Sequence, residues 1–237
     1  MFLRYQQIIF DVDDTLIDFA ATEDFALHSL FNAHHWQLTN DIQRRYHSYN
    51  QGLWRELELG KINYDQLTKM TFHNFIKKNL GLEVDGEKVM NEYRSYFGET
   101  HKLLPGVEDT LRFAKKQGYK LTVLTNGEKY MQRHRLELAG IKKYFDLIVT
   151  SEEAHYSKPD SHVFDYFFSR TEIGANDTVF FGDGLKSDIL GSENYGLDSI
   201  WYNHRHRKNT LNLHPIFEVD NYPQLVQLMQ NDFQRKY

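Results

Sequence analysis

The sequence has 237 residues, of which 41% are hydrophobic and 26% charged, and this composition excludes disorder or a fibrous repeat as the main state. Lys and Arg number 28 against 33 Asp and Glu, so the net charge of −5 provides no basic excess for binding a nucleic-acid polymer. No apolar window reaches the length of a membrane span, no signal-peptide layout is visible, and the absence of Cys excludes thiol chemistry. We therefore expect a soluble cytoplasmic protein, monomeric or homodimeric, with neither membrane nor nucleic acid as a partner.

The first predicted element is a short buried strand at residues 8–10, which runs directly into an acidic loop. From residue 18 to about residue 102 the periodicity is helical only, which predicts helices at 23–31, 41–59, 65–79 and 87–97. The glycines at 60, 81 and 98 are the expected helix ends.

Strands and helices alternate after residue 106. Strands are predicted at 119–124, 145–149, 178–181, 199–202 and 216–219, and helices at 107–117, 128–139, 161–170, 187–195 and 223–230. This alternation predicts a Rossmann-like α/β fold, in which a parallel sheet carries helices on both faces. We expect a core domain formed by residues 1–17 and 103–237, and an inserted helical cap domain at 18–102 above the carboxyl edge of the sheet.

Polar residues follow several predicted strands or lie in adjoining loops: Asp11, Asp13, Thr125, Asn126, Lys158, Asp183 and Asp188. Because parallel strands end at one edge of a sheet, we expect these side chains to converge there. Carboxylates that share a pocket repel one another unless they are protonated or bridged by a cation, and an oxygen-only ligand set suits Mg²⁺. The sequence therefore predicts a Mg²⁺ site.

A carboxylate beside Mg²⁺ can attack phosphorus and form an aspartyl-phosphate. Lys158, the Thr125 hydroxyl and backbone N–H groups could surround the phosphoryl oxygens. Asp13 lies two residues after Asp11, on the same side of an extended segment, and could act as general acid and then as general base. The arrangement predicts a phosphohydrolase site.

These residues resemble the four motifs of the haloacid dehalogenase-like hydrolase superfamily, carried by residues 11–15, Thr125, Lys158 with Pro159, and residues 182–188. The resemblance implies that Asp11 is the nucleophile, and that Asp13 is the acid/base and lends its backbone carbonyl to Mg²⁺. It implies that Thr125 and Lys158 hold the phosphoryl group. Asp183 would be a direct metal ligand, and Asp188 would support the metal or the lysine. The inserted helices resemble the superfamily's helical cap.

A closer resemblance is to the pyrimidine and noncanonical-nucleotide 5′-nucleotidase subfamily, carried by residues 50–54, 124–127, 135–140, 144–146, 151–153, 164–166 and 201–203. It implies hydrolysis of nucleoside 5′-monophosphates, either ordinary or modified. Three alternatives stay open. They are a sugar-phosphate phosphatase, a phosphomutase of the same superfamily, and a phospho-accepting signalling module.

The predicted cap would supply specificity through Asn50, as a hydrogen-bonding partner of the base, and Trp54, as a stacking partner. The alternative for Trp54 is packing in the cap's own core with Leu53 and Leu57. The basic run at residues 204–208 is predicted to be a solvated loop.

Overall fold

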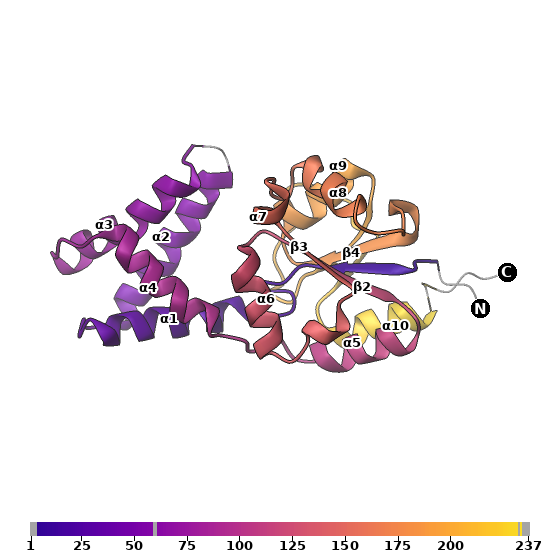
Figure 1. The fold of residues 1–237 in the computed structure, drawn as a ribbon, viewed down its shortest axis with the longest axis horizontal. Coiled ribbons are helices and arrows are strands. Elements are labelled where there is room, and N and C mark those ends of the chain that lie inside the picture. Colours follow the sequence, from indigo (N-terminus) through magenta and orange to yellow (C-terminus); the bar gives the residue numbers. More distant parts are fainter. Residues whose placement is uncertain (1–3, 59–60, 232, 234–237) are drawn as a thin grey trace. The chain divides into compact units, whose positions relative to one another are not determined.

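The computed structural model describes residues 4–58, 61–231 and 233 (Figure 1). The chain forms two compact units, which we call the core unit, Met1–Phe19 with His101–Tyr237, and the helical unit, Ala20–Thr100. The helical unit is thus two residues shorter at each end than the cap expected at 18–102. Action of the helical unit as a cap stays a prediction.

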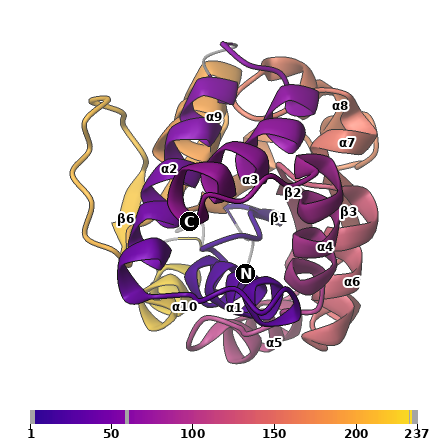
Figure 2. The same cartoon turned by 90° about the vertical axis from the view of Figure 1, so that its left-hand side faces the viewer.

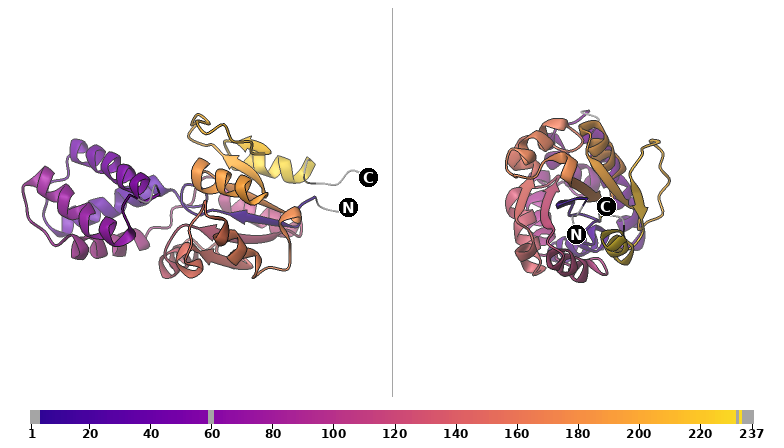
Figure 3. Two further views of the ribbon diagram at one scale, coloured as in Figure 1. Left: turned by 90° about the horizontal axis from the view of Figure 1, so that it is seen from above. Right: turned by 90° about the vertical axis from the view of Figure 1, so that its right-hand side faces the viewer.

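The core unit contains a single six-stranded sheet with the strand order β3-β2-β1-β4-β5-β6. The strands are β1 Gln7–Phe10, β2 Lys120–Thr125, β3 Leu147–Thr150, β4 Thr178–Gly182, β5 Asp198–Tyr202 and β6 Phe217–Val219. Every pairing is parallel. Strand β1 runs through the middle of the sheet, between β2 and β4 (Figure 3).

Helices connect the strands of the core unit. They are α5 Val107–Lys116, α6 Lys129–Leu138, α7 Ser151–Ala154, α8 Ser161–Phe168, α9 Leu190–Tyr195 and α10 Tyr222–Asn231, with short turns η1 Lys142–Tyr144, η2 Ala175–Asp177 and η3 Leu185–Ile189. Helices α5 and α10 lie on one side of the sheet and α8 and α9 on the other (Figure 1). The predicted Rossmann-like α/β fold is confirmed.

Alternation of side chains along the strands divides the core into two apolar layers. In β1, Ile8 and Phe10 belong to the layer that includes residues of α5 and α10, whereas Ile9 belongs to the layer that includes residues of α8. Because β1 is central, its short apolar run is buried on both faces, as parallel sheets require.

The helical unit consists of α1 Phe19–Ala33, α2 Asn40–Glu58, α3 Tyr64–Leu80 and α4 Gly86–Gly98, with the first residue of α1 contributed by the core unit (Figure 2). Its core combines aliphatic and aromatic side chains: the ring of Tyr46 stacks on Phe72 with centroids 5.4 Å apart and meets Phe75 edge-on at 5.3 Å. A capping box begins α3, in which Asn63 and Gln66 exchange side-chain-to-backbone hydrogen bonds. Gly81 ends α3 in the left-handed conformation, at φ 70°.

Several predicted elements were wrong in detail. Helix α7 was not predicted, because it has four residues and starts directly at the end of β3, where the Thr150 hydroxyl accepts from the Glu153 N–H. The predicted helix at 187–195 begins instead at Leu190, after the wider turn η3. That turn forms because the Asp188 carboxylate accepts a hydrogen bond from the Gly184 N–H at 2.8 Å.

The remaining differences concern element ends. The strand predicted at 145–149 begins at Leu147, since the preceding Asp146 uses its carboxylate to accept from the Leu121 N–H and from Lys115. Gly98 is the last residue of α4, and Glu99 follows as the helix cap. The predicted helix end at residues 59 and 60 lies outside the described residues. No helix within the described part of the chain is both long and apolar enough to cross a membrane.

Candidate active site

Three neighbouring strands place polar side chains at the carboxyl edge of the sheet. Asp11 follows the last residue of β1, Thr125 is the last residue of β2, and Asp183 follows β4. The order β2-β1-β4 brings these three ends side by side. One carboxylate oxygen from each of Asp11, Asp183 and Asp188 lies within 4.8 Å of the others, and all three residues are buried.

Lys158 joins two of these carboxylates. Its Nζ donates to Asp11 Oδ1 at 2.7 Å and to Asp188 Oδ1 at 2.8 Å, and its side chain is 1% exposed. The Lys158 backbone is fixed by Asn126, whose amide donates to the Lys158 carbonyl and accepts from the Lys158 N–H, both at 2.8 Å. Asn126, predicted to bind substrate, thus holds the segment that carries the lysine.

Glycine at position 182 is required by the approach of Asp188. A Cβ at Gly182 would lie 2.4 Å from Asp188 Oδ2 and 2.7 Å from its Cγ, closer than real Cβ contacts. Asp188 also accepts hydrogen bonds from the Gly184 N–H and from Lys158, so its carboxylate is fixed by two donors while it lies against Gly182. Packing around Asp188 therefore accounts for the glycine at position 182 of the motif at residues 182–188.

The electrostatics of the cluster favour a bound cation. Burial and the neighbouring carboxylates raise the pKa of Asp11, and Lys158 opposes this rise only in part. Burial and Asp188 raise the pKa of Asp183 to about 7 against the opposing Arg207. Burial alone would lower the pKa of Lys158, but Asp11 and Asp188 raise it, so the lysine stays charged. Three closely spaced carboxylates with oxygen-only ligands fit Mg²⁺.

Asp13 faces a different set of partners. Its carboxylate lies outside the cluster found among the described residues and accepts from Arg135 Nη1 at 2.7 Å and Gln132 Nε2 at 2.8 Å. The predicted metal contact through its backbone carbonyl stays a prediction. Gln132 Nε2 also lies 3.3 Å from the hydroxyl of Thr125, which is buried.

The sequence reasoning did not identify Gln132 and Arg135. A signal was present, because these two polar residues lie three apart on α6, on the same buried face as Leu136. A buried glutamine and arginine beside a buried leucine on one helix face indicate hydrogen-bonding partners elsewhere in the fold.

The basic run at 204–208 is an exposed loop, as predicted, but two of its arginines also reach acidic residues at the site, which was not predicted. It lies in the long connection between β5 and β6 (Figure 2). Arg207 Nη2 donates to the Asp183 carbonyl at 2.7 Å and to Asp183 Oδ2 at 2.5 Å, while Arg205 Nη2 donates to Asp14 Oδ1 at 2.7 Å. Asn203 holds the turn by accepting from the Arg207 N–H at 2.7 Å and donating to its carbonyl at 2.9 Å.

The predicted base-recognition residues lie on α2 of the helical unit. Asn50 is 6% exposed and donates to Glu23 Oε1 at 2.6 Å, so its amide joins α2 to α1. Leu53 and Leu57 pack in the unit's apolar core, whereas Trp54 is 39% exposed and is not part of that core. The alternative of Trp54 as a core residue is therefore wrong, and its stacking role stays a prediction.

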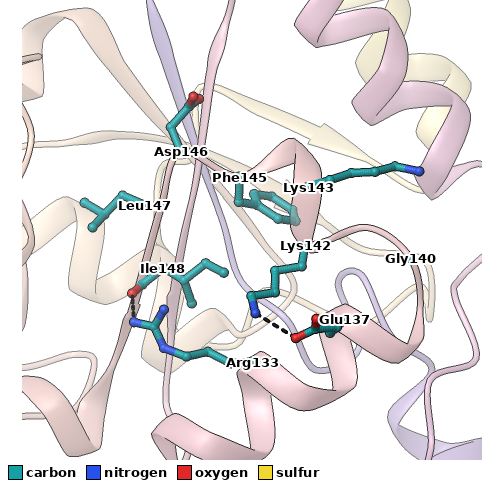
Figure 4. Close-up of a pocket in the computed structure, with 9 residues that line it drawn as sticks. All are labelled: Arg133, Glu137, Gly140, Lys142, Lys143, Phe145, Asp146, Leu147 and Ile148. Atoms are coloured by element: carbon teal, nitrogen blue, oxygen red, sulfur yellow. Dashed lines mark hydrogen bonds and ion pairs between the residues drawn. The ribbon is translucent and has the colours of Figure 1, made fainter.

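An open pocket of about 600 Å³ lies elsewhere on the core unit, beside α6, η1 and β3 (Figure 4). Its lining includes no residue of the carboxylate cluster. Its charged groups are already engaged: Lys142 with Glu137 at 2.7 Å, and Arg133 with the Ile148 carbonyl at 2.7 Å (Figure 4). We therefore place the candidate site at the sheet edge and not in this pocket.

The protein is a hydrolase built on this Rossmann-like core. It belongs to the haloacid dehalogenase-like hydrolase family, whose model matches residues 5–196. The HAD-hydrolase YfnB of Bacillus subtilis is 35% identical over 227 residues, which cover 95% of this chain and 96% of YfnB. A crystal structure of YfnB bound to magnesium matches with a TM-score of 0.91 over 95% of this chain and 99% of that chain.

Two relatives are named for an activity. PynA of Streptococcus pneumoniae and YjjG of Escherichia coli are pyrimidine 5′-nucleotidases, and each is 31% identical to this chain. The alignments cover 98% of this chain and 98% of PynA, and 96% of this chain and 99% of YjjG. The predicted resemblance to the family and to the pyrimidine 5′-nucleotidases is thereby confirmed.

Proposed function

We propose that the protein is a Mg²⁺-dependent phosphomonoesterase that hydrolyses nucleoside 5′-monophosphates, pyrimidine or noncanonical, through an aspartyl-phosphate on Asp11. The observation that carries the proposal is the contact of Lys158 with Asp11 and Asp188, inside a cluster completed by Asp183. The full-length similarity to two pyrimidine 5′-nucleotidases supports the choice of substrate.

In the proposed reaction, an Asp11 carboxylate oxygen attacks phosphorus, and the bond from phosphorus to the ester oxygen breaks. Asp13 gives a proton to the leaving nucleoside oxygen. Asp13 then takes a proton from a water molecule, whose oxygen attacks the aspartyl-phosphate and releases phosphate and the Asp11 carboxylate. Asp13 loses its proton in the first step and regains one from water in the second, so the complete cycle restores it.

Positive charge stabilises the phosphoryl oxygens as they are transferred. The charged Lys158, held 2.7 Å from Asp11 Oδ1, is the proposed protein contribution, together with the Thr125 hydroxyl. Mg²⁺ held by Asp11, Asp183 and Asp188 would offset the carboxylate charge and polarise the phosphoryl group when bound. Base recognition is assigned to the helical unit, with Trp54 as the proposed stacking residue because its ring is exposed.

The test is phosphate release from a panel of nucleoside monophosphates and sugar phosphates in the presence of Mg²⁺. We expect release from UMP, dUMP or dTMP to exceed release from sugar phosphates, and Asp11→Asn to reduce it to the rate without protein, because the nucleophile is lost. The matched control is Asp109→Asn, an exposed acidic residue on α5 that is expected to leave the rate unchanged.

Two outcomes would contradict the proposal. Full activity of Asp11→Asn would exclude the covalent mechanism, and faster Asp11-dependent release from sugar phosphates would move the assignment to a sugar-phosphate phosphatase. Trp54→Ala belongs in the same panel. We expect it to raise KM for nucleotides while leaving KM for base-free phosphate monoesters, such as sugar phosphates, unchanged.

A further inference from the structure

Gln132 and Arg135 hold the Asp13 carboxylate from the interior of the core unit. Arg135 Nη1 donates to Asp13 Oδ1 at 2.7 Å, and Gln132 Nε2 donates to Asp13 Oδ2 at 2.8 Å. The side chain of Arg135 is 0% exposed and Gln132 is 2% exposed, whereas the Asp13 side chain is 26% exposed. Asp13 is thus bonded on its inner side and open on its outer side.

The two hydrogen bonds end on different oxygens of one carboxylate. A single bond would leave the Asp13 carboxylate free to rotate about its own axis, but two bonds from separate side chains fix its plane. The donors are also tied to each other, since Arg135 Nη1 donates to Gln132 Oε1 at 3.1 Å. The three side chains form one connected network, which holds the outer lone pairs of Asp13 in a fixed direction.

Gly127 gives independent support, because it leaves room for the Gln132 amide. A Cβ at Gly127 would lie 2.6 Å from Gln132 Nε2 and 2.8 Å from Gln132 Cγ. Gly127 does not have a positive φ, so its backbone conformation does not itself require glycine. The absent side chain at 127 therefore makes space for the residue that bonds Asp13.

We propose that Gln132 and Arg135 are positioning residues that orient Asp13 toward the leaving oxygen of the substrate. The inference rests on the proposed function and deepens it by naming the substrate class that needs them. Phosphate esters of alcohols, such as nucleosides, leave as poor alkoxide leaving groups and require a proton from Asp13 as the bond to phosphorus breaks. Esters of acidic phenols leave as stable anions and do not require that proton.

The experiment compares UMP with p-nitrophenyl phosphate for the full chain with Mg²⁺ and for the variants Gln132→Met, Gly127→Ala and Arg135→Lys. We expect each variant to lower kcat/KM for UMP by at least about tenfold, a part of the 10²–10⁴ that acid–base catalysis contributes. For p-nitrophenyl phosphate, kcat/KM reports the formation of the aspartyl-phosphate, which needs no proton from Asp13, so we expect it to stay close to the unaltered value. The kcat for this substrate also includes hydrolysis of the aspartyl-phosphate, in which Asp13 acts as the base, and is expected to fall. Asp13→Asn should show the same selectivity with a larger loss.

Glu137→Gln is the matched control, because this residue lies on the same helix with its side chain 66% exposed. Thermal unfolding identifies any variant that fails to fold. Arg135→Lys changes a fully buried residue and is the variant most prone to misfold. If it does, the comparison is made with Gln132→Met and Gly127→Ala. Gln132→Met removes the Gln132 amide, and Gly127→Ala displaces it by adding a Cβ beside it.

Equal losses of kcat/KM on both substrates would overturn the inference, because they indicate a general structural role. Unchanged rates for Gln132→Met and Gly127→Ala on UMP would overturn it as well. Full phosphate release by Asp11→Asn would instead overturn the proposed function, together with the inference that depends on it. The two failures are therefore distinguishable in one set of assays.

Discussion

Arg207 holds Asp183 through two atoms at once, the carbonyl oxygen and carboxylate Oδ2. The indole N–H of Trp201 donates to the same carbonyl at 3.0 Å, so the backbone and side chain of Asp183 are both fixed. Groups that orient a metal ligand in this way affect metal affinity without touching the metal. Arg207 should therefore govern how well Asp183 can serve the proposed Mg²⁺ site.

We expect Arg207→Lys to weaken Mg²⁺ binding by about 10- to 100-fold, because the charge is kept while the planar guanidinium that spans both Asp183 atoms is lost. Isothermal titration calorimetry measures the affinity, and the fluorescence of Trp201 offers a second readout beside Asp183. Arg205→Lys is the matched control, since Arg205 contacts Asp14 and not the carboxylate cluster. Tighter binding by Arg207→Lys would show that Arg207 competes with the cation.

At the residue scale, the sequence predicted the cluster well and its supports poorly. Asp11, Lys158, Asp183 and Asp188 were predicted to converge because each follows a strand or lies in an adjoining loop, and the structure brings them together. Arg207 was not predicted to reach Asp183, because the fold of the β5–β6 connection depends on hydrogen bonds of Asn203 to the turn. Such side-chain-to-backbone contacts leave no periodic pattern in a sequence.

Helices α1 and α2 are joined by a polar cluster around His47. Its Nδ1 contacts the buried carboxylate of Glu23, and its Nε2 lies 3.0 Å from Asp24 Oδ1. The hydrogen bond with Glu23 raises the pKa of His47, against the lowering effect of burial, and Asp24 adds to the rise. Protonated His47 thus links one helix to two carboxylates of the other.

Because the pKa of His47 is raised in the folded state, the stabilisation from its ion pairs decreases as the pH rises. It is fully present below the unfolded-state value of about 6.5 and is lost as the pH rises through the higher folded-state pKa. We expect thermal stability to fall by an amount worth about 1 kcal/mol or less over that window, since the side chain is 28% exposed. His47→Gln should flatten the profile, as measured by circular dichroism.

The matched control for this prediction is His214→Gln, a well exposed histidine of the core unit. An unchanged pH profile in His47→Gln would contradict the assigned role of His47. A profile that rises with pH between the two pKa values in the unaltered protein would contradict the sign of the effect.

At the element scale, the strands and the long helices were predictable from their patterns, and the shortest helical segments were not. Three of the four helices of the helical unit were expected within one residue of their observed ends, because each carries an apolar stripe over several turns, whereas α1 begins four residues before the predicted start. Helix α7 and the turn η3 have four and five residues, too few to show a period. Their geometry is set by the Thr150 hydroxyl and the Asp188 carboxylate.

At the scale of the whole molecule, the two chain segments that lead into and out of the helical unit contact each other within the core unit. Ile17 and Leu103 form an antiparallel bridge, the Asp18 N–H donates to the Lys102 carbonyl at 2.9 Å, and Lys102 pairs with the Asp18 carboxylate at 2.9 Å. These contacts lie entirely within the core unit. The two chain ends that lead to the helical unit are therefore held together by the core itself.

We expect replacement of residues 20–100 by a short Gly-Ser linker to leave a folded core that still binds Mg²⁺. The denaturant m-value should fall in proportion to the apolar surface removed, while the transition stays cooperative. Urea unfolding followed by circular dichroism, with calorimetry for Mg²⁺, measures both. A non-cooperative transition, or loss of Mg²⁺ binding, would show that the core needs the inserted helices.

The central position of β1 also fixes an order of events during synthesis. Ile9 leaves the ribosome early, but its neighbour Phe180 on β4 follows only after roughly 10–30 s at ordinary rates of translation. The helical unit is continuous in sequence and emerges within that interval, so it can fold while β1 still lacks both neighbours. The strand that leads into the proposed nucleophile is thus among the first segments made, yet it gains its second neighbour only when β4 is made.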